Sequence, residues 1–172
     1  VEDYLVAGHC SEAIEILRRL VARHPGEDSF VLKLAWAYHD GGFLDEAVAC
    51  FEALLEKELQ RRIFTGFAFD ELVRIYKREG RYDNRVAICE RAMAAQPEDY
   101  ALMGDLGDAY LKTGDVAKAV AIFRRMTELE PDDAMAYCRL GNALAAGEEF
   151  DAAEAAYRRA GENEPLSAAA YY

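Results

Sequence analysis

The chain has 172 residues and is poor in the residues that most catalytic and metal sites use. It contains only three histidines, three serines and four cysteines, and the members of each type are dispersed along the chain. Cys10, Cys50, Cys89 and Cys138 form no C-x-x-C pair and have no neighbouring histidine at ligand spacing. This pattern indicates neither a zinc site nor a disulfide framework. We therefore expect reduced, half-buried thiols, no bound metal and no cofactor.

Recognisable catalytic arrangements are also lacking. His9, His24 and His39 are dispersed, and two of the three serines sit at expected helix starts, so no Ser-His-Asp triad can be assembled. Gly104 and Gly107 are not preceded by the strand that a phosphate-binding glycine loop requires. We predict that the chain is not an enzyme.

Positive charge is scarce, and it is concentrated in one stretch. The net charge is −12, which disfavours nonspecific binding to nucleic acid. Residues 1–56 carry 4 basic against 11 acidic residues, residues 57–91 carry 9 against 6, and residues 92–172 carry 7 against 15. The basic stretch is either a set of solvated faces that offset the acidic neighbours or a local site for an acidic group. No apolar run approaches the ~20 residues of a membrane span.

An internal repeat is the strongest feature present. Pro97, Pro131 and Pro165 stand 34 residues apart, and a similar pattern of large and small apolar residues precedes each of them. A unit of this length is a helix pair that cannot bury its apolar face alone, so stability must come from stacking on neighbours. No stretch alternates with a period of two over the length of a strand, which predicts an entirely helical chain.

Glycines and short polar residues predict where the helices end and begin. Gly42, Gly80 and Gly114 interrupt the apolar periodicity. The residues expected to cap the helices that follow are Ser11, Asp45, Asp83 and Asp151 for second helices, and Asp99, Asp133 and Ser167 for first helices.

The repeat resembles the tetratricopeptide repeat, and residues 100–133 match its pattern best. That unit reads Met103, Leu106, Gly107, Tyr110, Ala119, Phe123 and Pro131 at the family's packing positions. The resemblance implies an all-α fold, a right-handed superhelical array of antiparallel helix pairs. It covers residues 1–172 as a single domain: a partial repeat at 1–27, repeats at 28–65, 66–99, 100–133 and 134–167, and the start of a further helix at 168–172.

One repeat is irregular. The interval from Tyr38 to Tyr76 is 38 residues, whereas the interval from Tyr76 to Tyr110 is 34. The four extra residues are about one helical turn, so we predict that a lengthened helix absorbs them between residues 56 and 69. The repeat at 66–99 also places Arg85 where the family has a small Ala and Cys89 where it has an aromatic residue, which predicts looser packing.

The family resemblance implies that first helices line a concave groove, and it names the residues that face it. Small residues at Ala101, Gly104, Ala145 and Ala146 are expected to leave one end of this groove open. Further members of the set are Ser29, Leu32, Asp40, Leu111 and Cys138. The binding residues proposed from this set are Trp36, His39, Phe67, Asp70, Arg74, Lys77, Arg78, Asp108, Lys112, Met135 and Asn142.

Trp36, the only tryptophan, lies off the apolar stripe formed by Leu34, Ala35 and Tyr38. One interpretation is an exposed anchor for a partner, since tryptophan is over-represented at interface hot spots. The other is that Trp36 packs onto the first helix of the next repeat and stiffens the array.

The function that this resemblance implies is a scaffold that binds a partner peptide or protein segment in the groove. Arg74, Lys77 and Arg78 share a first helix one repeat along from Trp36, which predicts a ligand with an acidic group next to a bulky apolar residue. The carboxylate-binding subfamily that recognises chaperone tails is disfavoured, because Cys138 stands where its Lys would be, and Gly104 and Asp108 occupy other ligand positions. Two alternatives remain: a structural spacer or self-association segment, and a regulatory arm of a catalytic domain outside the chain. We expect a cytoplasmic protein, with any targeting segment outside this sequence.

Overall fold

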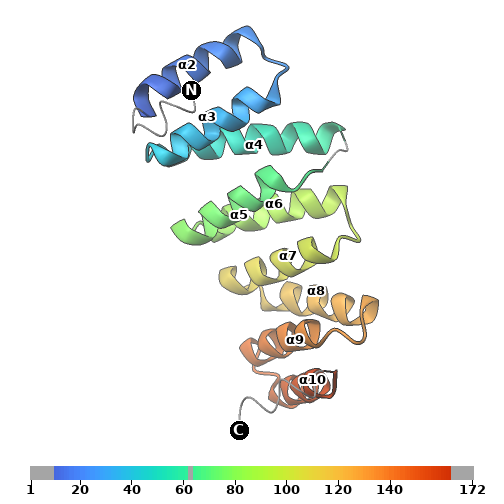
Figure 1. Ribbon diagram of the computed structural model, residues 1–172. Helices are drawn as coiled ribbons and strands as arrows, with labels where there is room; N and C mark the ends of the chain where they lie inside the picture. The colour runs from blue at the N-terminus through green and yellow to red at the C-terminus, as the bar shows by residue number, and fades with distance from the viewer. Residues whose placement is uncertain (1–9, 62–63, 164–172) are drawn as a thin grey trace. The chain divides into compact units, whose positions relative to one another are not determined.

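The computed structural model describes residues 10–61 and 64–163, and every regular element in them is an α-helix (Figure 1). The helical prediction is therefore confirmed for this part of the chain. The helices are α2 (Cys10–Arg23), α3 (Asp28–Asp40), α4 (Leu44–Arg61), α5 (Phe67–Glu79), α6 (Tyr82–Ala95), α7 (Tyr100–Thr113), α8 (Val116–Leu129), α9 (Ala134–Ala146) and α10 (Phe150–Asn163).

The chain forms two compact units, Val1–Gly80 and Arg81–Tyr172. In the first unit α3 packs against both α2 and α4, and α4 packs against α5 (Figure 1). In the second unit each helix from α6 to α9 packs on the helix that follows it. Within each unit, helices therefore pack mainly on their neighbours in the chain, as a repeat array requires.

Small residues let the paired helices approach one another. A Cβ atom added to Gly107 on α7 would lie 2.5 Å from the ring of Phe123 on α8, and one added to Gly141 on α9 would lie 2.6 Å from Tyr157 on α10. Both distances are far below van der Waals contact, so a larger residue at either place would force the facing ring to move. The sequence pattern had indicated this packing role for Gly107.

The four extra residues lengthen α4, as predicted. This helix has 18 residues, whereas each of the others has 13 or 14 described residues. The added turn carries Lys57 and Arg61, whose side chains donate hydrogen bonds of 2.8 and 2.6 Å to the carboxylate of Asp28 at the start of α3. The hydrogen bond from Lys57 is the main reason that the pKa of Asp28 lies below its ordinary value. Part of the basic stretch thus neutralises an acidic neighbour.

Helix ends follow the predicted chemistry only in part. Asp99 accepts a hydrogen bond from the backbone N–H of Leu102 at 3.0 Å, and Asp133 accepts one from Met135 at 2.8 Å, so both capping predictions are confirmed. Gly114 closes α7 in the left-handed region at φ +85°. Ser167 lies outside the described residues.

The capping predictions for Asp45, Asp83 and Asp151 are wrong. Their helices α4, α6 and α10 each begin one residue earlier, so these carboxylates lie in the first turn, and Ser11 likewise lies inside α2. Negative charge in a first turn is still favourable, because it faces the positive end of the helix dipole.

Arg85 on α6 replaces the expected alanine by entering the core. It is only 4% exposed, and its Nη2 donates to Asp105 Oδ1 on α7 at 2.9 Å, while its Nε has no partner among the described residues. Cys89, one turn further along α6, is fully buried, and burial is the main reason that its pKa is raised to about 12. Because both side chains are buried, neither is a reactive group at the surface.

Candidate interaction surfaces

An aromatic cluster joins α3 to α4 and α5 in the first unit. Trp36 is half-buried, and its ring centroid lies 5.8 Å from that of Phe51 and 6.2 Å from that of Phe67, both edge-on. The guanidinium carbon of Arg74 lies 5.6 Å from the Trp36 ring centroid. Trp36 therefore packs onto the next first helix, as the second interpretation predicted, and keeps part of its surface exposed. Phe67 remains 43% exposed beside it.

Basic side chains extend this surface along α5. Arg74 pairs with Glu71 one turn earlier, so its guanidinium is already oriented by a carboxylate and an indole. Arg78 pairs with the neighbouring Glu79 at 3.1 Å. Lys77 is exposed and has no ion-pair partner among the described residues. Of these three cations, Lys77 is the one most available to a ligand.

His39 lies one turn from Trp36 on α3. Its ring is 5.6 Å from the Trp36 ring in an edge-on contact, and its Nδ1 lies 3.2 Å from Asp40 Oδ1. Its Nε2 is buried without a hydrogen-bond partner in the described part of the chain. The contact with Asp40 favours the proton on Nδ1, which leaves Nε2 as an unpaired acceptor. The remaining predicted residue of this unit, Asp70, is exposed on α5.

The predicted residues of the second unit are less available. Asn142 Oδ1 accepts a hydrogen bond of 2.7 Å from the hydroxyl of Tyr157, so this amide is engaged within its own helix pair. Asp108 lies 3.9 Å from Arg139 Nη2. Lys112 and Met135 are exposed, and Met135 retains 59% of its surface.

The expectation of an open end beside Gly104 is wrong. Gly104 is buried, and a Cβ atom there would lie 2.5 Å from Arg139 Nη1. The long side chain of Arg139 on α9 fills the space that the glycine on α7 leaves. Sequence reasoning missed Arg139 and also Glu71. The sequence did contain a signal for Arg139: it is a large residue at the repeat position that faces Gly104 of the preceding repeat.

Groups that could bind a metal are not assembled in the described residues, where no set of three or more His, Cys, Asp or Glu side chains has suitable geometry. In residues 10–61 and 64–163, no helix combines the length and apolar character needed to cross a membrane.

Comparison with known proteins identifies the repeats. Family models described as tetratricopeptide repeat match residues 1–62, 76–137 and 134–165. The chain belongs to the tetratricopeptide repeat family, and its fold is an all-α solenoid of helix pairs. Proteins of this class serve as scaffolds for interactions with proteins or peptides. Among curated protein sequences, none matches the chain.

Solved structures with a similar fold cover nearly the whole chain. A crystal structure of MamA aligns with a TM-score of 0.67 and 20% identity over 96% of this chain and 95% of the other. A Podosopora anserina protein with nearly identical TPR-like repeats aligns with a TM-score of 0.66 and 20% identity, over 96% and 92%. MamA from Desulfovibrio magneticus RS-1 aligns with a TM-score of 0.64 and 20% identity, over 95% and 90%. At these identities the likeness establishes the fold alone.

Proposed function

We propose that this chain binds a segment of a partner protein along its first helices, with the surface around Trp36 and Phe67 as the principal contact. The observation that carries the proposal is the half-buried indole of the only tryptophan, which contacts two phenylalanine rings edge-on, the buried Phe51 and the exposed Phe67. Rigid aromatic side chains supply a large contact area at low entropic cost, which suits them to an interface anchor.

The ligand that fits this surface presents a bulky apolar residue next to an acidic group. The apolar residue contacts Phe67 and the open edge of Trp36. The acidic group meets Lys77, with Arg74 and Arg78 close by in sequence on the same helix. Because Arg74 and Arg78 already have carboxylate partners, they contribute less than free cations would. The apolar contact therefore supplies most of the affinity and the charges most of the selectivity.

A binding comparison among three variants tests this proposal. Trp36→Ala and Phe67→Ala should each reduce capture of a partner segment, while Phe150→Ala should not. Phe150 is a matched control, because it is also an exposed aromatic residue, at 67%, and lies on α10 in the other unit. Phe67→Ala provides a second test should Trp36→Ala not fold, because Phe67 is exposed and is the first residue of α5. Equal capture by all three variants would refute the assignment.

A further inference from the structure

Two junctions between successive repeats are joined by the same tyrosine–glutamate hydrogen bond. Tyr76 on α5 donates from its hydroxyl to Glu52 Oε1 on α4 at 2.6 Å, and Tyr110 on α7 donates to Glu90 Oε1 on α6 at 2.7 Å. Each glutamate directly follows the residue that fills the second-helix packing position, Phe51 or Cys89. The bond therefore joins equivalent positions of the repeat, one pair in each unit.

The junction between α2 and α3 keeps the tyrosine but has lost the glutamate. Tyr38 is the equivalent of Tyr76 and Tyr110, and the residue that directly follows the packing position Leu17 is Arg18. Neither the Tyr38 hydroxyl nor the Arg18 guanidinium has a hydrogen-bond or ion-pair partner among the described residues. Two donors thus stand where the other junctions contain one donor and one carboxylate.

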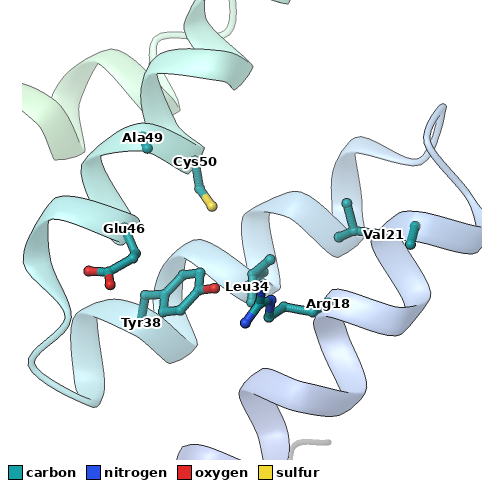
Figure 2. A pocket seen from close by; sticks show the side chains of 8 residues that line it. Arg18, Val21, Leu34, Tyr38, Glu46, Ala49 and Cys50 are labelled. Atoms are coloured by element: carbon teal, nitrogen blue, oxygen red, sulfur yellow. The ribbon is translucent and has the colours of Figure 1, made fainter.

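Both donors line an open apolar pocket of about 370 Å³ (Figure 2). Figure 2 shows the Tyr38 hydroxyl pointing toward the Arg18 side chain, with Leu34 beside them, Val21 on α2, and Cys50 on α4 across the opening. The apolar walls reduce the access of water to a group bound there, which strengthens a charge-assisted hydrogen bond.

A second hollow of about 360 Å³ continues the first. It shares Arg18, Tyr38 and Glu46 with the first pocket, and Ile14 and Phe43 supply its apolar walls. Two adjoining hollows with the donors in their shared wall suit a chain segment of several residues better than a single small molecule.

We infer that this trough between α2 and α4 binds a protein segment in which one Asp or Glu side chain is flanked by apolar residues. Its carboxylate accepts hydrogen bonds from Arg18 and Tyr38, taking the place that Glu52 and Glu90 occupy in the other junctions. The flanking apolar side chains enter the two hollows.

A single carboxylate fits better than an acidic cluster. Glu46 is an exposed carboxylate on the α4 wall with no ion-pair partner in the part of the chain that the structure describes, and residues 1–56 carry 4 basic against 11 acidic residues. Additional negative charge on the ligand would therefore be repelled.

The junction between α8 and α9 has the arginine but lacks the tyrosine. Arg124 on α8 is equivalent to Arg18, and it also lines an open pocket, with Val116 and Val120. The residue equivalent to Tyr38 there is Leu144, which has no hydroxyl. Only the α2–α3 junction combines a free arginine with a free tyrosine in the described residues.

Selection from a peptide library tests this inference with the full chain. The probe is a library of random dodecapeptides fused to a carrier at their C-termini, so that only side-chain carboxylates are available. Peptides retained by the wild type are counter-selected on Arg18→Glu, a variant that restores the carboxylate found in the other junctions. The survivors should share one Asp or Glu between apolar residues.

Individual survivors then provide the quantitative test. Replacing the peptide's Asp by Asn or its Glu by Gln should weaken binding about tenfold or more, and Tyr38→Phe should weaken it several-fold. Arg19→Glu is the control, since Arg19 is the next residue of α2, is exposed, and pairs with Glu15. Circular dichroism verifies that the variants fold, and Tyr38→Phe, which keeps the ring, provides a second probe should Arg18→Glu not fold.

Several results would overturn the inference: no peptide that distinguishes wild type from Arg18→Glu, survivors without a carboxylate, or an equal effect of Arg19→Glu. Tight binding of a peptide whose only carboxylate is its free C-terminus would assign the site to chain ends instead. Trp36→Ala should leave these peptides unaffected, so failure of this site and failure of the α3–α5 surface are separable.

Discussion

The guanidinium of Arg74 lies over the ring of Trp36, with 5.6 Å between its central carbon and the ring centroid, and it pairs with Glu71 at the same time. The cation on α5 is thus bound to the anchor on α3 before any ligand arrives. This arrangement orders the Trp36 surface and lowers the share of ligand affinity that Arg74 can supply.

Charge reversal on α5 should have a salt-dependent effect on binding. For Arg74→Glu combined with Lys77→Glu, we expect a loss of about 0.2–1 kcal/mol for each exposed pairing with an acidic ligand, larger at low than at high salt. Trp36→Ala should weaken binding at both salt concentrations, because apolar contact is not screened. Calorimetric titration of a partner at two ionic strengths measures both effects. If the double variant lost the same affinity at both salt concentrations, Arg74 and Lys77 would not act on the ligand through their charge.

The close approach of α7 and α8 should not tolerate a methyl group. Gly107→Ala places a Cβ atom 2.5 Å from Phe123, so we expect a loss of about 1–3 kcal/mol in the free energy of unfolding. Gly161→Ala on α10 is the matched control: nothing lies within 4 Å of its Cβ, and alanine favours a helix interior by about 0.5–1 kcal/mol. Chemical denaturation of both variants decides, and similar stabilities would contradict the packing account.

The hydrogen bond between Tyr110 and Glu90 should contribute measurably to stability. Tyr110→Phe should lower the free energy of unfolding by about 1 kcal/mol, since Glu90 is partly hydrated in the folded state. Tyr38→Phe is the control, because its hydroxyl has no partner in the described residues, and it should change stability by less than about 0.5 kcal/mol. Equal losses in the two variants would show that the hydrogen bond adds nothing.

The raised pKa of Tyr110 predicts that the protein loses stability at high pH. Burial, followed by the hydrogen bond to Glu90, raises the pKa of Tyr110 to about 12, against about 10 for an unfolded tyrosine. The protonated hydroxyl is thus retained more strongly in the folded state, so its contribution is complete below pH ~10 and is lost as the pH rises toward 12. Denaturation across this range should show a steeper loss in the wild type than in Tyr110→Phe. Parallel curves would refute the assignment.

The repeat at 66–99 should open more easily in its second helix. α6 contains a buried cysteine and a buried arginine whose Nε has no hydrogen-bond partner within residues 10–61 and 64–163, where α8 contains Ala119 and Phe123. Amide exchange should therefore be faster in residues 83–95 than in residues 117–129. Mass spectrometry of exchanged peptides measures this difference. Equal or slower exchange in 83–95 would mean that the Asp105 pair compensates for the altered packing.

Local periodicity predicted most of the fold, and spatial neighbours explain what it missed. The helices and the role of Gly107 follow from residue spacing within one repeat, and the lengthened helix follows from the interval between successive repeats. The position of Arg139 over Gly104 depends on how two repeats face each other, which no local pattern encodes. The surroundings of Trp36 similarly required the positions of α4 and α5. The predicted caps of α4, α6 and α10 were displaced by two residues, because an acidic side chain favours a cap and a first turn almost equally.

The fluorescence of Trp36 provides the most direct test of the proposed binding surface. Since Trp36 is the only tryptophan, the emission of the chain reports on this surface alone. A partner segment that covers Trp36 should shift the emission to shorter wavelength or change its intensity, with a midpoint equal to the dissociation constant measured by calorimetry. Saturated binding with unchanged emission, together with wild-type affinity in Trp36→Ala, would contradict the account.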